Sequence, residues 1–134
     1  MGATVTLDIN QGPAHQELVD NGKAAFWTKS WLGDYPDAEN YLALFYSPNF
    51  SPAGPDKTHF KSAEYDRLYK TALREPNEAR RQTLYQQLDR LMLAESPVIV
   101  LFYDEVIRLT QPGVRGLKAD PMNQLRLERV RKDR

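Results

Sequence analysis

Apolar and polar positions alternate, or recur at helical spacing, along most of the chain, and these patterns predict its elements. Residues 5–9 alternate Val, Leu and Ile with polar residues, which predicts a strand with one buried face. A short helix is expected from Pro13, because proline suits the first helical position, and residues 23–31 are expected to return as a second strand. A strand, a helix and a strand within about 30 residues predict a right-handed βαβ unit.

Two longer helices are predicted in the middle of the chain. Ser62 is expected to cap a helix that runs to residue 74, with one apolar face formed by Tyr65, Leu68, Tyr69, Ala72 and Leu73. Asn77 is expected to cap the next helix, to about residue 95, whose inward residues are Leu84, Leu88, Leu91 and Met92. Because the link between them is short, the two helices are expected to pack as neighbours.

The C-terminal part reads as extended chain. Residues 98–103 form a continuous apolar run, which predicts a central strand buried on both faces, and residues 124–130 predict a last strand. The expected fold class is therefore α/β, with a mixed sheet and helices packed on it, in a single domain over residues 1–134. Residues 47–60 hold three prolines and a glycine and are expected to form a long surface loop.

The stretch 31–42 is the most informative part of the sequence. Gly33 and Pro36 are turn residues, and they separate the expected strand 23–31 from a helix expected over residues 38–46. Asp37 is a suitable N-cap for that helix, with Asn40 at its third position. Trp31, Asp34 and Tyr35 therefore lie where a strand is expected to end, and in α/β sheets ligands collect at the carboxyl ends of strands. An aromatic ring and a carboxylate at this place suit an amine or a polar small molecule.

These residues also carry a resemblance to a known family. The run Trp-x-x-Asp-Tyr-Pro-Asp-Ala-x-Asn-Tyr-Leu at 31–42 resembles the signature of the family 5 extracellular solute-binding proteins, the oligopeptide- and dipeptide-binding type. The match continues in the same order with Lys-Ser-Ala-Glu-Tyr-Asp-Arg-Leu at 61–68, Arg-Gln-Thr-Leu-Tyr at 81–85, Glu-Ser-Pro-Val-Ile-Val-Leu at 95–101 and Val-Arg-Gly-Leu at 114–117.

The resemblance implies a fold, a function and a set of partners. Family members are several times longer and have two lobes, so this chain looks like the C-terminal lobe alone, one lobe of a type II periplasmic-binding-protein-like fold. The implied function is binding of a peptide or similar small solute for uptake by an ABC importer, with the permease subunits and the missing N-terminal lobe as partners. The implied location is the periplasm or the cell surface. Met1-Gly2 is not followed by an apolar segment, so the signal is expected upstream.

Three residues are the candidate ligand-binding set: Trp31, Asp34 and Tyr35. In the family, the aspartate at the position of Asp34 faces the cleft and pairs with the amino group of a peptide, and the resemblance implies that role here. The residues alone, without the resemblance, favour a turn aspartate that bonds its own backbone at Asp34. Trp31 suits either a wall of the cleft or the core, and Trp27 shares its face of the expected strand.

Composition and spacing limit the other classes of function. The chain has 18 basic and 18 acidic residues, whereas nucleic-acid binding would need a clustered basic excess. It has no cysteine, and its two histidines lack the spacing of a metal site, so neither a metal nor another cofactor is expected. A carboxylate-based hydrolase using Asp34, Asp37 and Glu39 stays open as an alternative, although capping and turn roles explain these residues. An interaction domain without a small ligand also stays open, and self-association of this chain is expected if residues 103–111 are uncovered.

Overall fold

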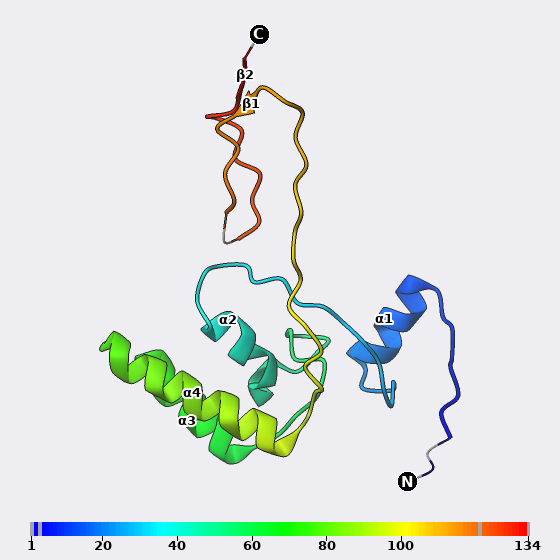
Figure 1. The fold of residues 1–134 in the computed structure, drawn as a ribbon. Coiled ribbons are helices and arrows are strands. Elements are labelled where there is room, and N and C mark those ends of the chain that lie inside the picture. Colours follow the sequence, from blue (N-terminus) through cyan, green and yellow to red (C-terminus); the bar gives the residue numbers. More distant parts are fainter. Residues whose placement is uncertain (1, 3, 121, 134) are drawn as a thin grey trace.

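The computed structural model describes residues 2, 4–120 and 122–133; residues 1, 3, 121 and 134 lie outside the description. Three helices, α2, α3 and α4, form a helical body, with α1 to one side of it. An extended segment leads away from α4 to a two-stranded hairpin near the C-terminus (Figure 1). None of the described helices is long and apolar enough to cross a membrane.

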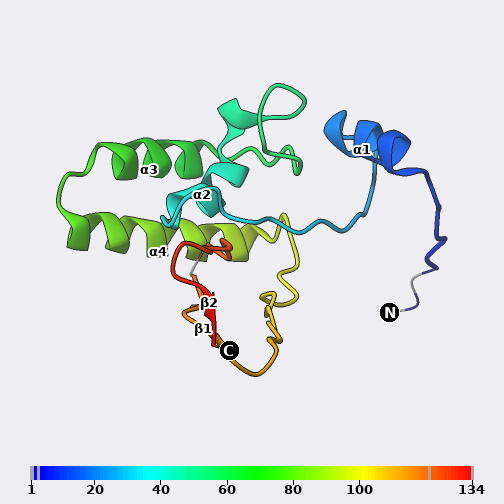
Figure 2. The ribbon, with the colours of Figure 1, turned by 90° about the horizontal axis from the view of Figure 1, so that it is seen from above.

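The two long helices form where the sequence predicts them. Helix α3 spans Ala63–Arg74, and the Ser62 hydroxyl accepts a hydrogen bond from the Tyr65 amide at 3.3 Å. Helix α4 spans Glu78–Glu95, and the Asn77 side chain accepts from the Arg80 amide at 3.0 Å. Each cap satisfies an N–H group that the first turn of a helix leaves free. The predicted packing of these helices against each other is confirmed (Figure 2).

The core lies between α3, α4 and the short segment before them. That segment is α2, Glu39–Leu42, followed by a 3₁₀ turn, η1, Ala43–Phe45, in place of the single helix predicted over 38–46. The buried cluster joins Leu42, Phe45, Tyr65, Tyr69, Ala72, Tyr85, Leu88 and Met92. The Tyr65 hydroxyl donates to the Leu42 carbonyl oxygen at 2.8 Å, which ties α3 to α2. Leu73 was predicted on the buried face but is exposed.

The predicted mixed sheet is not present in the described part of the chain. The described residues instead form a two-stranded sheet. Its strands are β1, Val114–Arg115, and β2, Arg131–Lys132, which pair antiparallel with Val114 opposite Lys132. The strands predicted over 5–9, 23–31, 98–103 and 124–130 do not pair with other described residues, so these predictions are wrong. An apolar pattern favours extended backbone, but a strand needs a neighbour for its N–H and C=O groups.

The N-terminal part consists of one helix without the flanking strands of a βαβ unit. Helix α1 spans Gly12–Asp20, with a proline in its first turn as predicted, and buries Val19. Contacts at its C-terminal end attach it to the loop after α2: the Ser51 hydroxyl donates to the Asp20 carbonyl oxygen at 2.8 Å, and Lys57 pairs with the Asp20 carboxylate at 2.7 Å. The lysine lowers the pKa of Asp20, which keeps the pair charged.

The loop over residues 47–60 is more ordered than a plain surface loop. It begins with a 3₁₀ turn, η2, Ser47–Asn49, and closes on itself through Asp56. The backbone of Asp56 exchanges hydrogen bonds with Asn49 and Ser51, and its carboxylate accepts from the amides of Thr58 and His59. Asp56 is fully buried, and this burial raises the pKa of its carboxyl group.

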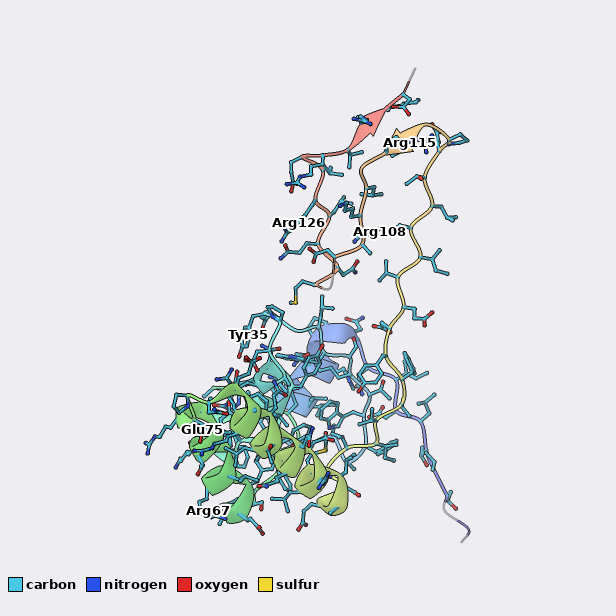
Figure 3. The ribbon with its side chains drawn as sticks, turned by 60° about the vertical axis from the view of Figure 1, so that its left-hand side comes forward. Tyr35, Arg67, Glu75, Arg108, Arg115 and Arg126 are labelled. Atoms are coloured by element: carbon cyan, nitrogen blue, oxygen red, sulfur yellow. The ribbon has the colours of Figure 1, made fainter. Side chains whose placement is uncertain are left out.

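The hairpin region, residues 110–133, forms an arm that is held mainly by arginines. Arg108 donates to the Asn123 carbonyl oxygen at 3.0 Å, Arg126 pairs with Asp120 at 3.2 Å, and Arg115 pairs with Asp133 at 3.1 Å. Figure 3 shows these arginines along the arm, and Tyr35 on the side of the helical body that faces it. The arm therefore lies over the turn that the sequence singles out.

The segment between α4 and the arm, residues 98–109, is extended and largely uncovered. Val98 touches the core, but the apolar side chains after it are exposed, with Tyr103 at 90% and Leu109 at 92%. The expected exposure of Val106, Ile107 and Leu109 is confirmed, whereas the expected burial of residues 98–103 on both faces is wrong.

We expect this segment to cause self-association of the chain. Exposed apolar residues on extended backbone pair readily with another chain. Light scattering should therefore give a mass above 15.4 kDa that rises with concentration. Ile107→Lys should reduce the mass, whereas Leu73→Lys, which changes an exposed apolar residue on α3, should not. A mass of 15.4 kDa at every concentration would contradict the prediction.

Candidate functional site

The candidate site is the turn over residues 31–37, which leads into α2. Backbone and side-chain hydrogen bonds of Asp37 shape the turn: its amide donates to the Tyr35 carbonyl oxygen at 2.9 Å, and its carboxylate accepts from the Glu39 amide at 2.9 Å. Helix α2 begins at Glu39 with Ala38 in the N-cap position, so the predicted N-cap, Asp37, lies one residue before the cap. This carboxylate is engaged in holding the first turn of the helix.

Asp34 differs from Asp37 in what its side chain does. It is exposed, and no described residue donates a hydrogen bond to its carboxylate. Its backbone amide, by contrast, donates to Asn40 Oδ1 at 3.3 Å. Among the described residues, the Asp34 side chain forms no hydrogen bond with the local backbone of the kind expected for a turn aspartate.

Trp31 lies at the start of the turn and is half-buried. Its indole Nε1–H donates to Asn40 Oδ1 at 2.8 Å, so Trp31 and Asp34 share one acceptor. Trp27 is also half-buried, and neither tryptophan belongs to the buried cluster of the core. Trp31 therefore keeps part of its ring at the surface beside Asp34.

Tyr35 points to the other side of the turn, toward Glu39. The hydroxyl groups of Tyr35 and Tyr69 each donate to one oxygen of the Glu39 carboxylate. The hydrogen bond with Glu39 raises the pKa of Tyr35, and burial, together with the same carboxylate, raises the pKa of Tyr69. Both hydroxyl groups therefore stay protonated and donate at neutral pH, and Glu39 joins the turn to α3.

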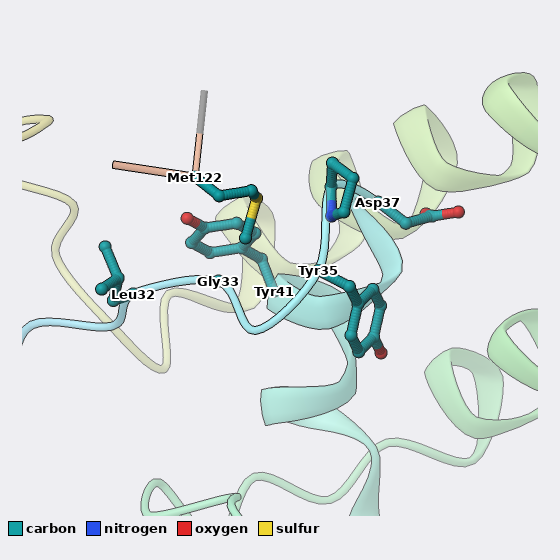
Figure 4. A pocket seen from close by; sticks show the side chains of 7 residues that line it. Leu32, Gly33, Tyr35, Asp37, Tyr41 and Met122 are labelled. Carbon is teal, nitrogen blue, oxygen red and sulfur yellow. The ribbon is translucent and has the colours of Figure 1, made fainter. Parts of the chain in front are cut away.

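A hollow of about 260 Å³ opens beside the turn. It is lined by Leu32, Gly33, Tyr35, Pro36, Asp37, Tyr41 and Met122, the last from the arm. Figure 4 shows Met122 next to the Tyr41 ring, with the Tyr35 ring on the other side of the turn. Ligand sites usually measure about 300–1,000 Å³, so this hollow is close to the lower limit. Two of the lining residues, Leu32 and Tyr41, are not among the candidates that the sequence indicates.

The surroundings of the hollow are acidic. The sequence has no lysine, arginine or histidine between Lys29 and Lys57, whereas Asp34, Asp37 and Glu39 fall within that interval. Burial, followed by the nearby charge of Asp37, raises the pKa of the Tyr85 hydroxyl group on α4, and the positive charge of Arg81 acts in the opposite direction. The arrangement favours a cationic group over an anionic one.

The described residues show no metal site near the turn or elsewhere. They contain no group of three or more His, Asp or Glu side chains arranged to hold a metal ion. His59 interacts with the Ser51 hydroxyl through Nε2 at 3.0 Å, inside the loop over residues 47–60. Asp37 and Glu39 already accept hydrogen bonds from the backbone and from tyrosines, which leaves Asp34 as the free carboxylate of this acidic cluster.

Comparison with known proteins identifies relatives that match most of this chain. No family model matches the chain. It is 29% identical over 116 residues to the probable deoxycholate-binding periplasmic protein YgiS of Escherichia coli, which covers 87% of this chain and 21% of that protein. It is 29% identical over 106 residues to the dipeptide-binding protein DppE of Bacillus subtilis, covering 79% and 19%.

A third relative shows how far along the chain the similarity extends. The periplasmic oligopeptide-binding protein OppA of Salmonella typhimurium is 21% identical over 126 residues, covering 93% of this chain and 22% of that protein. The chain thus spans about a fifth of the length of the curated relatives it matches. These names describe binding proteins, and the similarity includes the turn, the helical body and part of the arm.

Proposed function

We propose that this chain is part of a family 5 extracellular solute-binding protein and that its turn over residues 31–37 binds peptides for uptake by an ABC importer. The observation that carries the proposal is the exposed, unpaired carboxylate of Asp34 beside the partly exposed Trp31 ring. A carboxylate of this kind suits the ammonium group of a peptide. Tyr35 follows Asp34 in the chain, and its side chain points to the other side of the turn, where it is bonded to Glu39.

The charge around the turn supports a peptide rather than an organic anion as the ligand. Two relatives are named for peptides, and YgiS is named for deoxycholate, which carries a carboxylate. A carboxylate would meet repulsion from Asp34, Asp37 and Glu39, and the stretch between Lys29 and Lys57 that holds them has no basic residue of its own. The N-terminal ammonium group of a peptide meets attraction from the same residues.

The proposal includes the place of the chain in a larger protein. The matched segment is about a fifth of each relative's length, in keeping with part of the C-terminal lobe of a two-lobed, type II periplasmic-binding-protein-like fold. The other lobe would supply the facing wall of the site, and the permease subunits of the importer would receive the solute. The location proposed for the whole protein is the periplasm, and the proposed role is binding without catalysis.

An NMR titration tests the site. A short peptide at high millimolar concentration should shift the Trp31 indole and the amide signals of residues 33–37, whereas the same peptide with an acetylated N-terminus should shift them much less. Asp34→Ala should remove the difference between the two peptides. Asp104→Ala, which removes an exposed carboxylate on the segment over residues 98–109, should leave it unchanged.

Other results would contradict the proposal. Shifts confined to residues far from the turn would place the site elsewhere. An equal response to both peptides would remove the role of Asp34 in binding an ammonium group. If the chain hydrolysed a glycoside and Asp34→Asn abolished this turnover, the carboxylate-based hydrolase would be favoured. If native mass spectra showed no bound peptide at any concentration, an interaction domain without a small ligand would be favoured.

A further inference from the structure

Asn40 is the residue on which the candidate site converges. It lies on α2 and is buried, with 5% of its surface exposed. Its side-chain oxygen accepts the Trp31 indole N–H at 2.8 Å and the Asp34 amide at 3.3 Å. A carbonyl oxygen has two lone pairs, and both are used here by the residues proposed to bind the ligand.

The third candidate residue, Tyr35, is bonded to Glu39 instead. Glu39 raises the pKa of Tyr35, and the side chain of Asn40 acts on that pKa in the opposite direction. Trp31, Asp34 and Tyr35 lie on backbone without regular secondary structure. Asn40 lies on α2, and Leu42, two residues further along the same helix, belongs to the core. Asn40 therefore connects the irregular turn to the rigid part of the fold.

A buried amide is costly unless its polar atoms are bonded, so Asn40 and the turn depend on each other. If its oxygen were removed, the indole N–H and the Asp34 amide would lose their shared acceptor. The Trp31 ring would then rotate more freely, and the backbone from which the Asp34 carboxylate extends would no longer be fixed. Sites that bind by preorganised groups lose affinity when such supporting contacts are removed.

We infer that Asn40 is a positioning residue, which orients the Trp31 ring and fixes the Asp34 backbone for a ligand that Asn40 itself does not touch. The effect on ligand binding rests on the proposed function, whereas the effect on Trp31 does not. The two can therefore be measured separately.

The first measurement follows the two indole N–H signals by NMR, without any ligand. In the unmodified chain, the Trp31 indole hydrogen should exchange with solvent more slowly than that of Trp27, for which no described residue is an acceptor. Asn40→Ala should shift the Trp31 indole signal and remove its protection, while Asn40→Asp, which keeps an oxygen at the same place, should retain much of it. Asn49→Ala is the matched control, because the Asn49 amide donates to the Ala43 carbonyl oxygen and not to the turn.

The outcomes are separable even if a variant folds poorly. The amide signals of α3 and α4 report whether the helical body is intact in each variant. Equal exchange of the two indoles in the unmodified chain would overturn the inference without any substitution. An Asn49→Ala variant that disturbs the Trp31 indole as much as Asn40→Ala would overturn it as well.

The second measurement adds the peptide with a free N-terminus. With an intact helical body, Asn40→Ala should bind it roughly five- to tenfold more weakly than the unmodified chain, as expected for the loss of an ordinary hydrogen bond. Asn49→Ala should bind it normally. If the unmodified chain shows no response at the turn, the proposed function fails, while the indole measurement still decides the role of Asn40. Unchanged binding in an Asn40→Ala variant with a freed indole would overturn the positioning role.

Discussion

Replacing Leu88 by alanine is expected to lower the free energy of unfolding by about 2–5 kcal/mol, the usual cost of truncating a buried leucine. Leu88 lies on α4, is fully buried, and belongs to the cluster that joins α4 to α3 and α2. The loss combines removal of apolar surface from the core with the cavity that remains. Small domains are stable by only about 5–15 kcal/mol, so this single change should remove a large share of the total.

Urea unfolding followed by circular dichroism measures the effect. Leu93→Ala is the matched control, because Leu93 is the same residue type on the same helix and is 49% exposed. We expect the control to change the free energy of unfolding by no more than about 0.5 kcal/mol. Equal losses for the two variants would show that the helical body is not the cooperative core of the chain.

The helical body could be predicted from sequence because its signals are local. Ser62 and Asn77 mark the starts of α3 and α4, and both caps form. The apolar residues at helical spacing bury Tyr65, Tyr69 and Leu88 as expected, and the short link between the helices leads them to pack together. The capping residues, the helical spacing of the apolar residues and the short link are each formed by residues close together in the sequence. These signals can therefore be recognised without knowledge of the fold.

The predicted strands failed for a physical reason that the sequence could not reveal. Residues 98–103 have the composition of a buried strand, yet their backbone has no partner among the described residues and their side chains are largely exposed. Whether such a run forms a strand depends on a neighbour that can be distant in sequence. The pairing of Val114–Arg115 with Arg131–Lys132, in contrast, uses residues with no apolar alternation and was missed.

The binding roles of Trp31, Asp34 and Tyr35 stay predictions, whereas the turn that holds them could be located from the sequence. Asp37 contacts the start of α2 without being its N-cap, and no described residue donates a hydrogen bond to the Asp34 carboxylate. The sequence indicated Asn40 only as the residue at the third position of a helix. In the structure, Asn40 accepts hydrogen bonds from two of the three candidate residues. A polar residue that is buried at the start of a short helix is a signal for such a role, but its burial is known only from the fold.

Short peptides are expected to bind this chain with a dissociation constant near millimolar or weaker. Small-ligand sites enclose roughly 70–90% of the ligand surface, whereas the hollow beside residues 31–37 is open and of only about 260 Å³. Two-lobed binding proteins achieve enclosure by hinge closure around the solute, and this chain cannot do so if it is part of one lobe, as proposed. The missing contacts and the missing enclosure both reduce the affinity.

The expected size of this loss follows from simple arithmetic. If a complete two-lobed protein bound a peptide near micromolar, the binding free energy would be about −8 kcal/mol, and half of the contacts would leave about −4 kcal/mol, which is near millimolar. Asp34 is solvent-exposed in this chain, and exposed ion pairs contribute only about 0–1 kcal/mol, so the affinity should not exceed that value.

The concentration dependence of the NMR shifts at Trp31 and at residues 33–37 gives the dissociation constant. A chain that includes the facing lobe should bind the same peptide roughly a thousandfold more tightly, which is the ratio of millimolar to micromolar affinity. Micromolar binding by the present chain would contradict the prediction, because it would mean that the open turn, with Met122 of the arm beside it, already makes most of the contacts that a peptide needs.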